Sequence, residues 1–117
     1  MNAKKLLLVA ALSLSSGAHA LTLDQSTGMV YAGCAGVYMA ESSIAYYTNR
    51  TDDYDRAQAL LDRASGRASD LIGDGRTTDI GEATVTRLLN SYRKNPAAGL
   101  ALVARERAVC REIFEKQ

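Results

Sequence analysis

The sequence predicts an all-α fold, a small up-down helical bundle of about four helices in which one disulfide joins the first helix to the last. Strand signals are scarce, because no run of alternating β-branched residues occurs and the helix formers Ala, Leu, Arg and Glu are common. Breaks at residues 48–52, 73–78 and 95–96 divide the chain into four helical stretches. Short connections make neighbouring helices antiparallel, as in an up-down bundle.

We interpret residues 1–20 as a secretory signal peptide. Two lysines precede a nine-residue apolar run, residues 6–14, and the segment ends in the small-x-small pattern Ala-His-Ala. The run has about half of the ~20 residues that a membrane-spanning helix needs. We therefore expect cleavage after Ala20, no stable membrane insertion afterwards, and a single helical domain over residues 21–117 that is periplasmic or secreted.

The first helix of the domain is expected over residues 25–47, with Asp24 or Ser26 as its N-cap. Small residues recur along it at every fourth position: Gly28, Ala32, Gly36 and Ala40. Such a stripe lets a neighbouring helix approach closely, in a membrane dimer or in a bundle. Because Asp24 and Glu41 interrupt any membrane-spanning segment, we expect tight packing inside a bundle.

The second helix is expected over residues 53–72, with Gly73 as its C-cap. Asp52 and Asp53 lie at its start, where negative charge interacts favourably with the helix dipole. Spacings of three and four residues define its buried stripe: Tyr54, Ala57, Leu61, Ala64, Ala68 and Leu71.

Residues 73–78 are expected to form a loop, followed by a third helix over residues 79–94. Asn95 then suits an N-cap and Pro96 the first position of a fourth helix, which we expect over residues 96–114. In an up-down bundle this helix lies beside the first one.

Cys34 and Cys110, on the first and the last helix, are expected to form a structural disulfide. An even cysteine count in a small exported domain indicates a bridge, and two cysteines allow one pairing. In the chain-entropy model, closing a loop of this length stabilises the fold by roughly 4.5 kcal/mol. A redox or metal pair is disfavoured by the spacing, which is not C-x-x-C, and by the lack of a His co-ligand after cleavage.

Charge and composition argue against several classes of function. The full chain carries 14 Lys and Arg, 13 Asp and Glu and one His, with a net charge of +1. Loss of Lys4, Lys5 and His19 leaves 12 basic and 13 acidic residues, a net charge of −1 and no His. Such a balance gives no reason to expect nucleic acid as a partner. Without His, and with both cysteines oxidised, Ser-His-Asp and Cys-His sites are excluded, and we expect no cofactor.

Five of the six tyrosines fall between positions 31 and 54. We expect Tyr38 and Tyr54 in the core. Tyr46 and Tyr47 are neighbours on a helix and cannot both point inward equally well, so they are candidates for a contact surface. The candidate surface comprises Tyr46, Tyr47, Arg50 and Arg56, to which Arg63 could add, because Arg is often found in interfaces.

Carboxylates offer the remaining route to catalysis or metal binding. Glu41 and the residues around the 73–78 loop could pair as in a glycan hydrolase, or give oxygens to calcium. The spacing does not match an EF-hand, and exposed carboxylates are the ordinary interpretation. The loop candidates are Asp70, Asp74, Asp79 and Glu82.

These observations favour a non-enzymatic protein that binds another protein, as an inhibitor or immunity protein does. A chaperone-like or structural protein is the alternative, and a carboxylate-based cell-wall glycan hydrolase is a third. In outline, a small exported helical chain with one bridge resembles periplasmic acid chaperones and antitoxin-like immunity or inhibitor proteins, although no motif here can be matched to them residue by residue.

Overall fold

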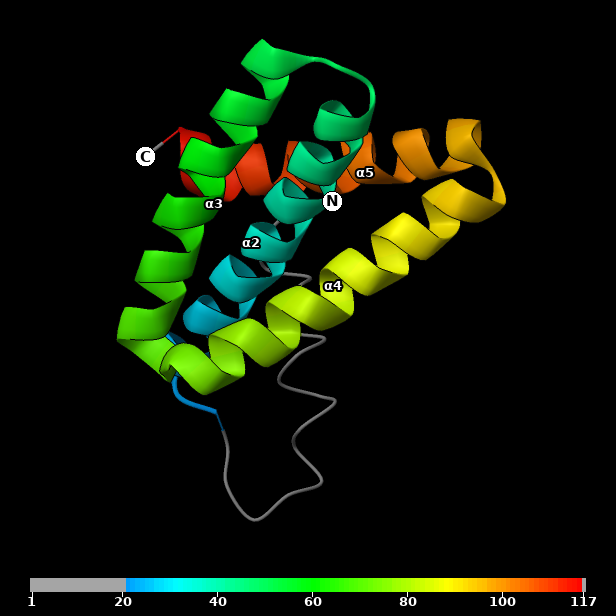
Figure 1. Cartoon of the computed structure of the whole chain (residues 1–117). Coiled ribbons are helices and arrows are strands. Elements are labelled where there is room, and N and C mark those ends of the chain that lie inside the picture. Colours follow the sequence, from blue (N-terminus) through cyan, green and yellow to red (C-terminus); the bar gives the residue numbers. More distant parts are fainter. Residues whose placement is uncertain (1–20, 117) are drawn as a thin grey trace.

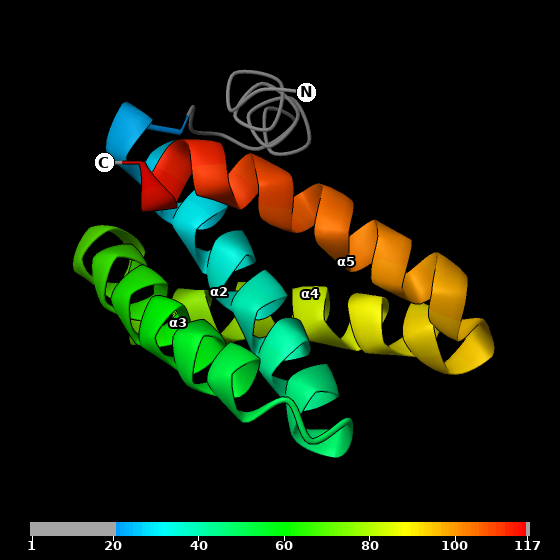
Figure 2. The ribbon, with the colours of Figure 1, turned by 90° about the horizontal axis from the view of Figure 1, so that it is seen from above.

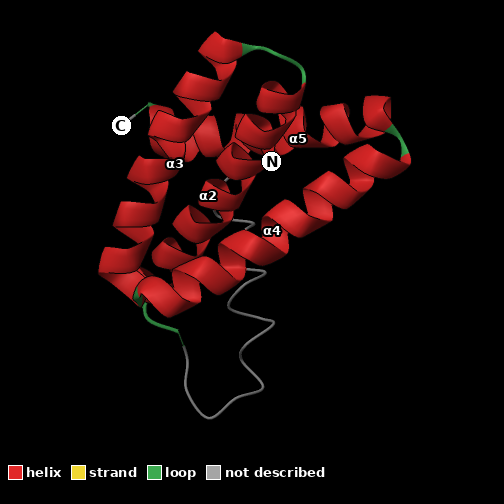
Figure 3. Cartoon of the chain, viewed as in Figure 1, coloured by secondary structure: helices red, strands yellow, loops and turns green. Residues whose placement is uncertain are grey.

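The computed structural model describes residues 21–116, and within this range the chain is helical with no strand (Figures 1 and 3). The helices are α2 (Leu23–Tyr47), α3 (Thr51–Ile72), α4 (Asp74–Lys94) and α5 (Pro96–Cys110), and a π-helical turn (Arg111–Glu115) continues α5. The predicted all-α class and four-helix bundle are confirmed. The proposed signal peptide, residues 1–20, lies outside the described residues.

The helix α2 is the centre of the bundle. It contacts α3, α4 and α5, and its contact with α3 is the most extensive. In Figure 2, α2 lies between α3 and α5, while α4 and α5 meet at one end of the molecule. The largest fully buried side chains are Tyr38 on α2, Leu88 on α4 and Phe114 in the π-helical turn. The expected core position of Tyr38 is therefore confirmed.

Small residues on α2 set how closely its neighbours approach. The predicted stripe from Gly28 to Ala40 is buried. A methyl group at Gly28 would lie 2.6 Å from Cγ2 of Ile72 at the end of α3. A methyl group at Gly36 would lie 2.6 Å from the carbonyl oxygen of Gly81 on α4. Both helices pack against α2 at distances that leave no room for a Cβ atom there, which confirms the expected tight packing.

The cap of α2 differs from the expected one. Thr22, not Asp24 or Ser26, is the N-cap: the Gln25 backbone N–H donates to Thr22 Oγ1 at 3.0 Å. The Thr22 backbone N–H donates in return to Gln25 Oε1 at 3.0 Å, which completes a capping box. The helix therefore begins at Leu23, two residues earlier than predicted.

The predicted loop over residues 73–78 is wrong. Gly73 alone separates α3 from α4, and its φ of +85° is a value that other residues rarely adopt. Because this one residue reverses the chain, α4 begins at Asp74, and Gly75 lies inside its first turn. At the next junction the prediction holds: Asn95 Oδ1 accepts from the Ala98 backbone N–H at 3.2 Å, and Pro96 is the first residue of α5.

Cys34 on α2 is bonded to Cys110 at the end of α5, with a Cα–Cα distance of 5.6 Å. The predicted disulfide between the first and the last helix is confirmed. The last helix was expected to run to residue 114, but the α-helix ends at Cys110. The π-helical turn then places Phe114 edge-on against Tyr31, with ring centroids 5.3 Å apart. None of the helices between residues 21 and 116 is both long enough and apolar enough to span a membrane.

Candidate functional site

Tyr46 and Tyr47, the last two residues of α2, form an exposed aromatic pair. Their exposed fractions are 63% and 82%. The two rings pack edge to face with centroids 5.4 Å apart, and Tyr46 also packs against Tyr54 of α3 at 5.9 Å. Tyr54 is partly buried beside Tyr46, so its expected position in the core is wrong. The structure places both candidate tyrosines at the surface, at the end of the bundle where α2 turns into α3.

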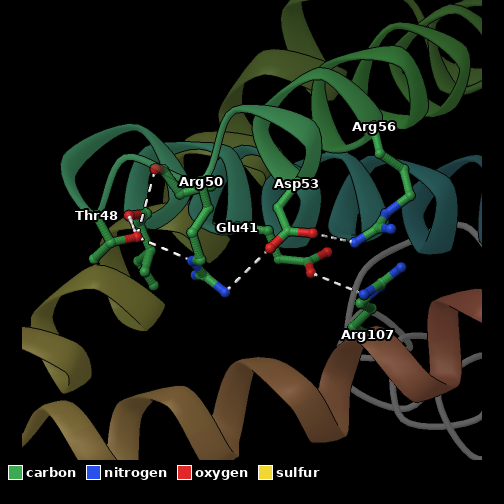
Figure 4. A network of polar contacts seen from close by, with 8 residues as sticks. Glu41, Thr48, Arg50, Asp53, Arg56 and Arg107 are labelled. Atoms are coloured by element: carbon green, nitrogen blue, oxygen red, sulfur yellow. Dashed lines mark hydrogen bonds and ion pairs between the residues drawn. The ribbon is translucent and has the colours of Figure 1, made fainter.

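Arg50 and Arg56, the two candidate arginines, are held by the carboxylate of Asp53, which was expected only to interact with the helix dipole. Asp53 Oδ2 lies 3.3 Å from Arg50 Nη1, and Asp53 Oδ1 lies 2.7 Å from Arg56 Nη2 (Figure 4). Arg50 Nε donates to Thr48 Oγ1 at 3.0 Å, and Thr48 Oγ1 donates to the Ile44 carbonyl oxygen at 2.7 Å. Both guanidinium-bearing side chains remain about half exposed.

Arg50 and Arg56 form one wall of a pocket of about 300 Å³ between the α2–α3 corner and α5. Arg107 of α5 and Arg111 of the π-helical turn approach from the opposite side. In Figure 4, the Arg107 guanidinium points across toward Glu41, whose Oε2 lies 3.4 Å from Arg107 Nη1. We call this the arginine pocket; it is lined by Glu41, Ile44, Arg50, Asp53, Arg56, Leu100, Val103, Ala104, Arg107, Ala108 and Arg111.

A largely buried polar cluster adjoins the arginine pocket. The Tyr38 hydroxyl donates to Glu115 Oε2 at 2.9 Å, and Glu115 Oε1 lies 3.8 Å from Arg107 Nη2. Burial, followed by the hydrogen bond to Glu115, raises the pKa of the Tyr38 hydroxyl far above its usual range. Burial also raises the pKa of the Glu41 carboxyl, and the positive charge of Arg107 opposes this shift only in part. The Nε atom of Arg107 is buried and has no hydrogen-bond partner among the described residues.

Arg107 and Arg111 were not predicted as site residues. A signal was present in the sequence: Val103, Arg107 and Arg111 lie four residues apart and therefore share one face of a helix. Val103 is in the core and Arg107 is only 19% exposed, so that face turns toward α2 and α3.

The carboxylates considered for hydrolysis or calcium binding are not brought together. Asp70, Asp74, Asp79 and Glu82 are exposed and flank the α3–α4 junction. Glu41 lies near Asp53 at the opposite end of α3, about 25 Å away at 1.5 Å per helical residue. Among residues 21–116, no group of three or more His, Cys, Asp or Glu side chains is placed to hold a metal ion.

A second cavity, of about 870 Å³, lies between α2, α4 and α5 beside the disulfide. We call it the apolar groove, because its lining is mainly aliphatic and includes Val30, Val37, Ile80, Leu102 and Val109. On its rim, the guanidinium of Arg87 donates two hydrogen bonds to Glu106, at 2.7 and 2.6 Å. The bond to Glu106 raises the pKa of Arg87 above its ordinary value.

Comparison of the chain with protein-family models, with curated proteins and with solved structures finds no match. The features from which a function can be inferred are therefore the aromatic pair, the arginine pocket and the apolar groove.

Proposed function

We propose that this is a small exported protein without catalytic activity that acts by binding another protein, in the manner of an inhibitor or immunity protein. The binding surface comprises Tyr46, Tyr47, Arg50 and Arg56. The observation that carries the proposal is the exposure of two adjacent, mutually packed tyrosines beside two half-exposed arginines. The disulfide is consistent with an oxidising compartment, which supports export.

Adjacent exposed tyrosines are well suited to contact a protein partner. Tyrosine combines a rigid apolar ring with a polar tip, and Tyr and Arg are enriched in the few residues that contribute most to protein interfaces. Here Tyr46 packs edge to face on Tyr47 and at a tilt on Tyr54, and these contacts hold the rings in place before any partner arrives. A surface that is already ordered loses less conformational entropy on binding.

The test is capture of a partner from a periplasmic extract with the disulfide-bonded protein as bait. We expect the double variant Tyr46→Ala, Tyr47→Ala to bind the captured partner about thirtyfold more weakly, since such anchor residues contribute about 2 kcal/mol or more. Leu23→Ala is the matched control, because Leu23 is 76% exposed at the other end of the same helix. Unchanged affinity of the tyrosine variant would remove this surface from the proposal.

The apolar groove favours a second candidate, a chaperone-like protein that shields apolar segments of its clients. A concave, mainly aliphatic cavity of about 870 Å³ is in the size range of ligand sites. This candidate predicts that an environment-sensitive apolar dye binds more strongly as the pH falls and the helices around the groove loosen. Dye fluorescence that stays flat from neutral to acid pH would count against it.

A further inference from the structure

The arginine pocket holds more positive charge and more hydrogen-bond donors than its own carboxylates use. Four guanidiniums meet there, against two lining carboxylates, Glu41 and Asp53. Even with Glu115 counted, the guanidiniums offer about twenty N–H donors to about twelve carboxylate acceptor positions. One carboxylate, that of Asp53, serves two arginines, Arg50 and Arg56. The pocket is therefore complementary to an additional negative group.

Arg107 is the most buried of the four arginines, and its contacts with carboxylates are long. Its guanidinium lies 3.4 Å from Glu41 and 3.8 Å from Glu115, longer than the usual distance for a charge-assisted hydrogen bond. Its Nε atom is buried and has no hydrogen-bond partner within residues 21–116. The Arg107 side chain is largely shielded from water, so a ligand that accepts from its Nη groups competes less with solvent than one that meets an exposed arginine.

Part of the lining is aliphatic. Ile44 of α2 and Leu100 and Val103 of α5 face the same space as the arginines. A bare inorganic anion makes no use of these side chains. A carboxylate at the end of a short aliphatic chain places its oxygens among the guanidiniums, in the forked geometry that arginine favours, and its methylene groups against the apolar wall.

We propose that the arginine pocket receives a glutamate or aspartate side chain of the protein partner. This inference rests on the proposed function and deepens it, because Arg50 and Arg56 belong both to the pocket and to the surface beside Tyr46 and Tyr47. The partner segment is then acidic, with an apolar or aromatic residue beside the acidic one to contact the tyrosine pair.

The first experiment uses a capped octapeptide of alternating Leu and Glu, and a copy with Gln for every Glu. Binding is followed through the Nε–Hε NMR signals of the arginine side chains. We expect a saturable shift of the Arg107, Arg50 and Arg56 signals with the Glu peptide, at least tenfold weaker binding of the Gln peptide, and weakening with added salt. The absence of a saturable shift with the Glu peptide would overturn the proposal.

Two further probes separate the possible sources of the carboxylate. Inorganic phosphate tests for a general anion site, and glutarate supplies the carboxylate and the aliphatic chain without a polypeptide. Tighter binding of the Glu peptide than of either probe supports a protein side chain as the ligand. Phosphate or glutarate binding as tightly as the peptide would overturn that assignment.

The double variant Arg50→Gln, Arg56→Gln tests the pocket by substitution, and we expect about tenfold weaker binding of the Glu peptide. Arg76→Gln with Arg93→Gln is the matched control, because it removes the same charge from exposed positions on α4, away from the pocket. Equal loss in the control would show nonspecific attraction and overturn the proposal.

The experiments can refute the proposed function and the proposed ligand of the arginine pocket independently of each other. A captured partner that binds the Arg50→Gln, Arg56→Gln variant at full strength refutes the pocket and leaves the function standing. Suppose instead that the peptide binds in the pocket and the captured partner binds the Tyr46→Ala, Tyr47→Ala variant at full strength. This result refutes the tyrosine surface and leaves the pocket standing.

Discussion

Replacing Gly36 with alanine is expected to destabilise the bundle, whereas the same replacement at Gly33, one turn away on α2, is expected to stabilise it. A Cβ atom at Gly36 would lie 2.5 Å from Cβ of Thr84 and 2.6 Å from the carbonyl oxygen of Gly81. No atom of the described part of the chain lies within 4 Å of a Cβ atom placed at Gly33. The two variants therefore differ in the clash with α4 and share the change in helix propensity.

The magnitudes follow from these two terms. Alanine stabilises a helix interior by about 1 kcal/mol relative to glycine, and this gain applies at both positions. Overpacking costs about 1–3 kcal/mol. The cost at Gly36 falls at the upper end, because the obstructing atoms are a backbone oxygen and a Cβ rather than a flexible side-chain tip. We expect Gly36→Ala to lose about 2 kcal/mol and Gly33→Ala to gain about 1 kcal/mol, a difference of about 3 kcal/mol in the free energy of unfolding.

Urea unfolding followed by circular dichroism at 222 nm measures this difference, with the disulfide intact in both variants. Equal m-values would show that the two variants unfold from equally compact states to equally open ones. Free energies of unfolding that agree within about 0.5 kcal/mol would refute the close approach of α2 and α4 as the reason for a glycine at position 36.

Three other outcomes are expected. Replacing both Cys34 and Cys110 with alanine should lower the free energy of unfolding by about 4.5 kcal/mol in the chain-entropy model, given their separation of 76 residues; a loss below about 1.5 kcal/mol in urea unfolding would contradict it. Because burial raises the pKa of Glu41, its ionised form is disfavoured in the folded state, and stability is lost as the pH rises through that raised pKa. Glu41→Gln should therefore be more stable relative to the wild type at pH 7 than at pH 4, and a difference that is constant over this range would refute the assignment. Asn95→Ala removes the cap of α5 and should cost about 1 kcal/mol, whereas Asn95→Asp should leave stability almost unchanged in the same assay.

The sequence was most informative where a local rule acts alone. The break between α2 and α3, the Asn95-Pro96 start of α5 and the acidic first turn of α3 depend on neighbouring residues only, and all three are found in the structure. Cys34 and Cys110 could be paired from the sequence because two cysteines admit one bridge.

The predictions failed where two local signals competed, or where tertiary contacts determined which residues are buried. Gly73 and Gly75 both read as loop residues, but only Gly73 takes a positive φ, and one such residue suffices for the turn. Leu60 is more buried than Leu61, because the direction from which α2 packs, rather than periodicity alone, decides which leucine faces the core.

Only two of the four arginines that line the arginine pocket could be predicted from the sequence. Arg50 and Arg56 stand close in sequence to the tyrosines and were chosen for that reason. Arg107 and Arg111 lie about fifty residues later, and only the packing of α5 against the α2–α3 corner brings them to the same space. The pattern that would have identified Arg107 and Arg111 as site residues is a charged residue within an apolar stripe of a helix.

The bond between Cys34 and Cys110 also determines how the molecule responds to mechanical tension. Every residue from 35 to 109 lies inside the covalent loop that this bond closes, including all of α3 and α4. A pull on the two ends of the domain can therefore unravel only the first turns of α2 and the segment after Cys110 before the load passes to the sulfur atoms. This load does not reach the end of the bundle that carries Tyr46, Arg50 and Arg56 as long as the disulfide is intact.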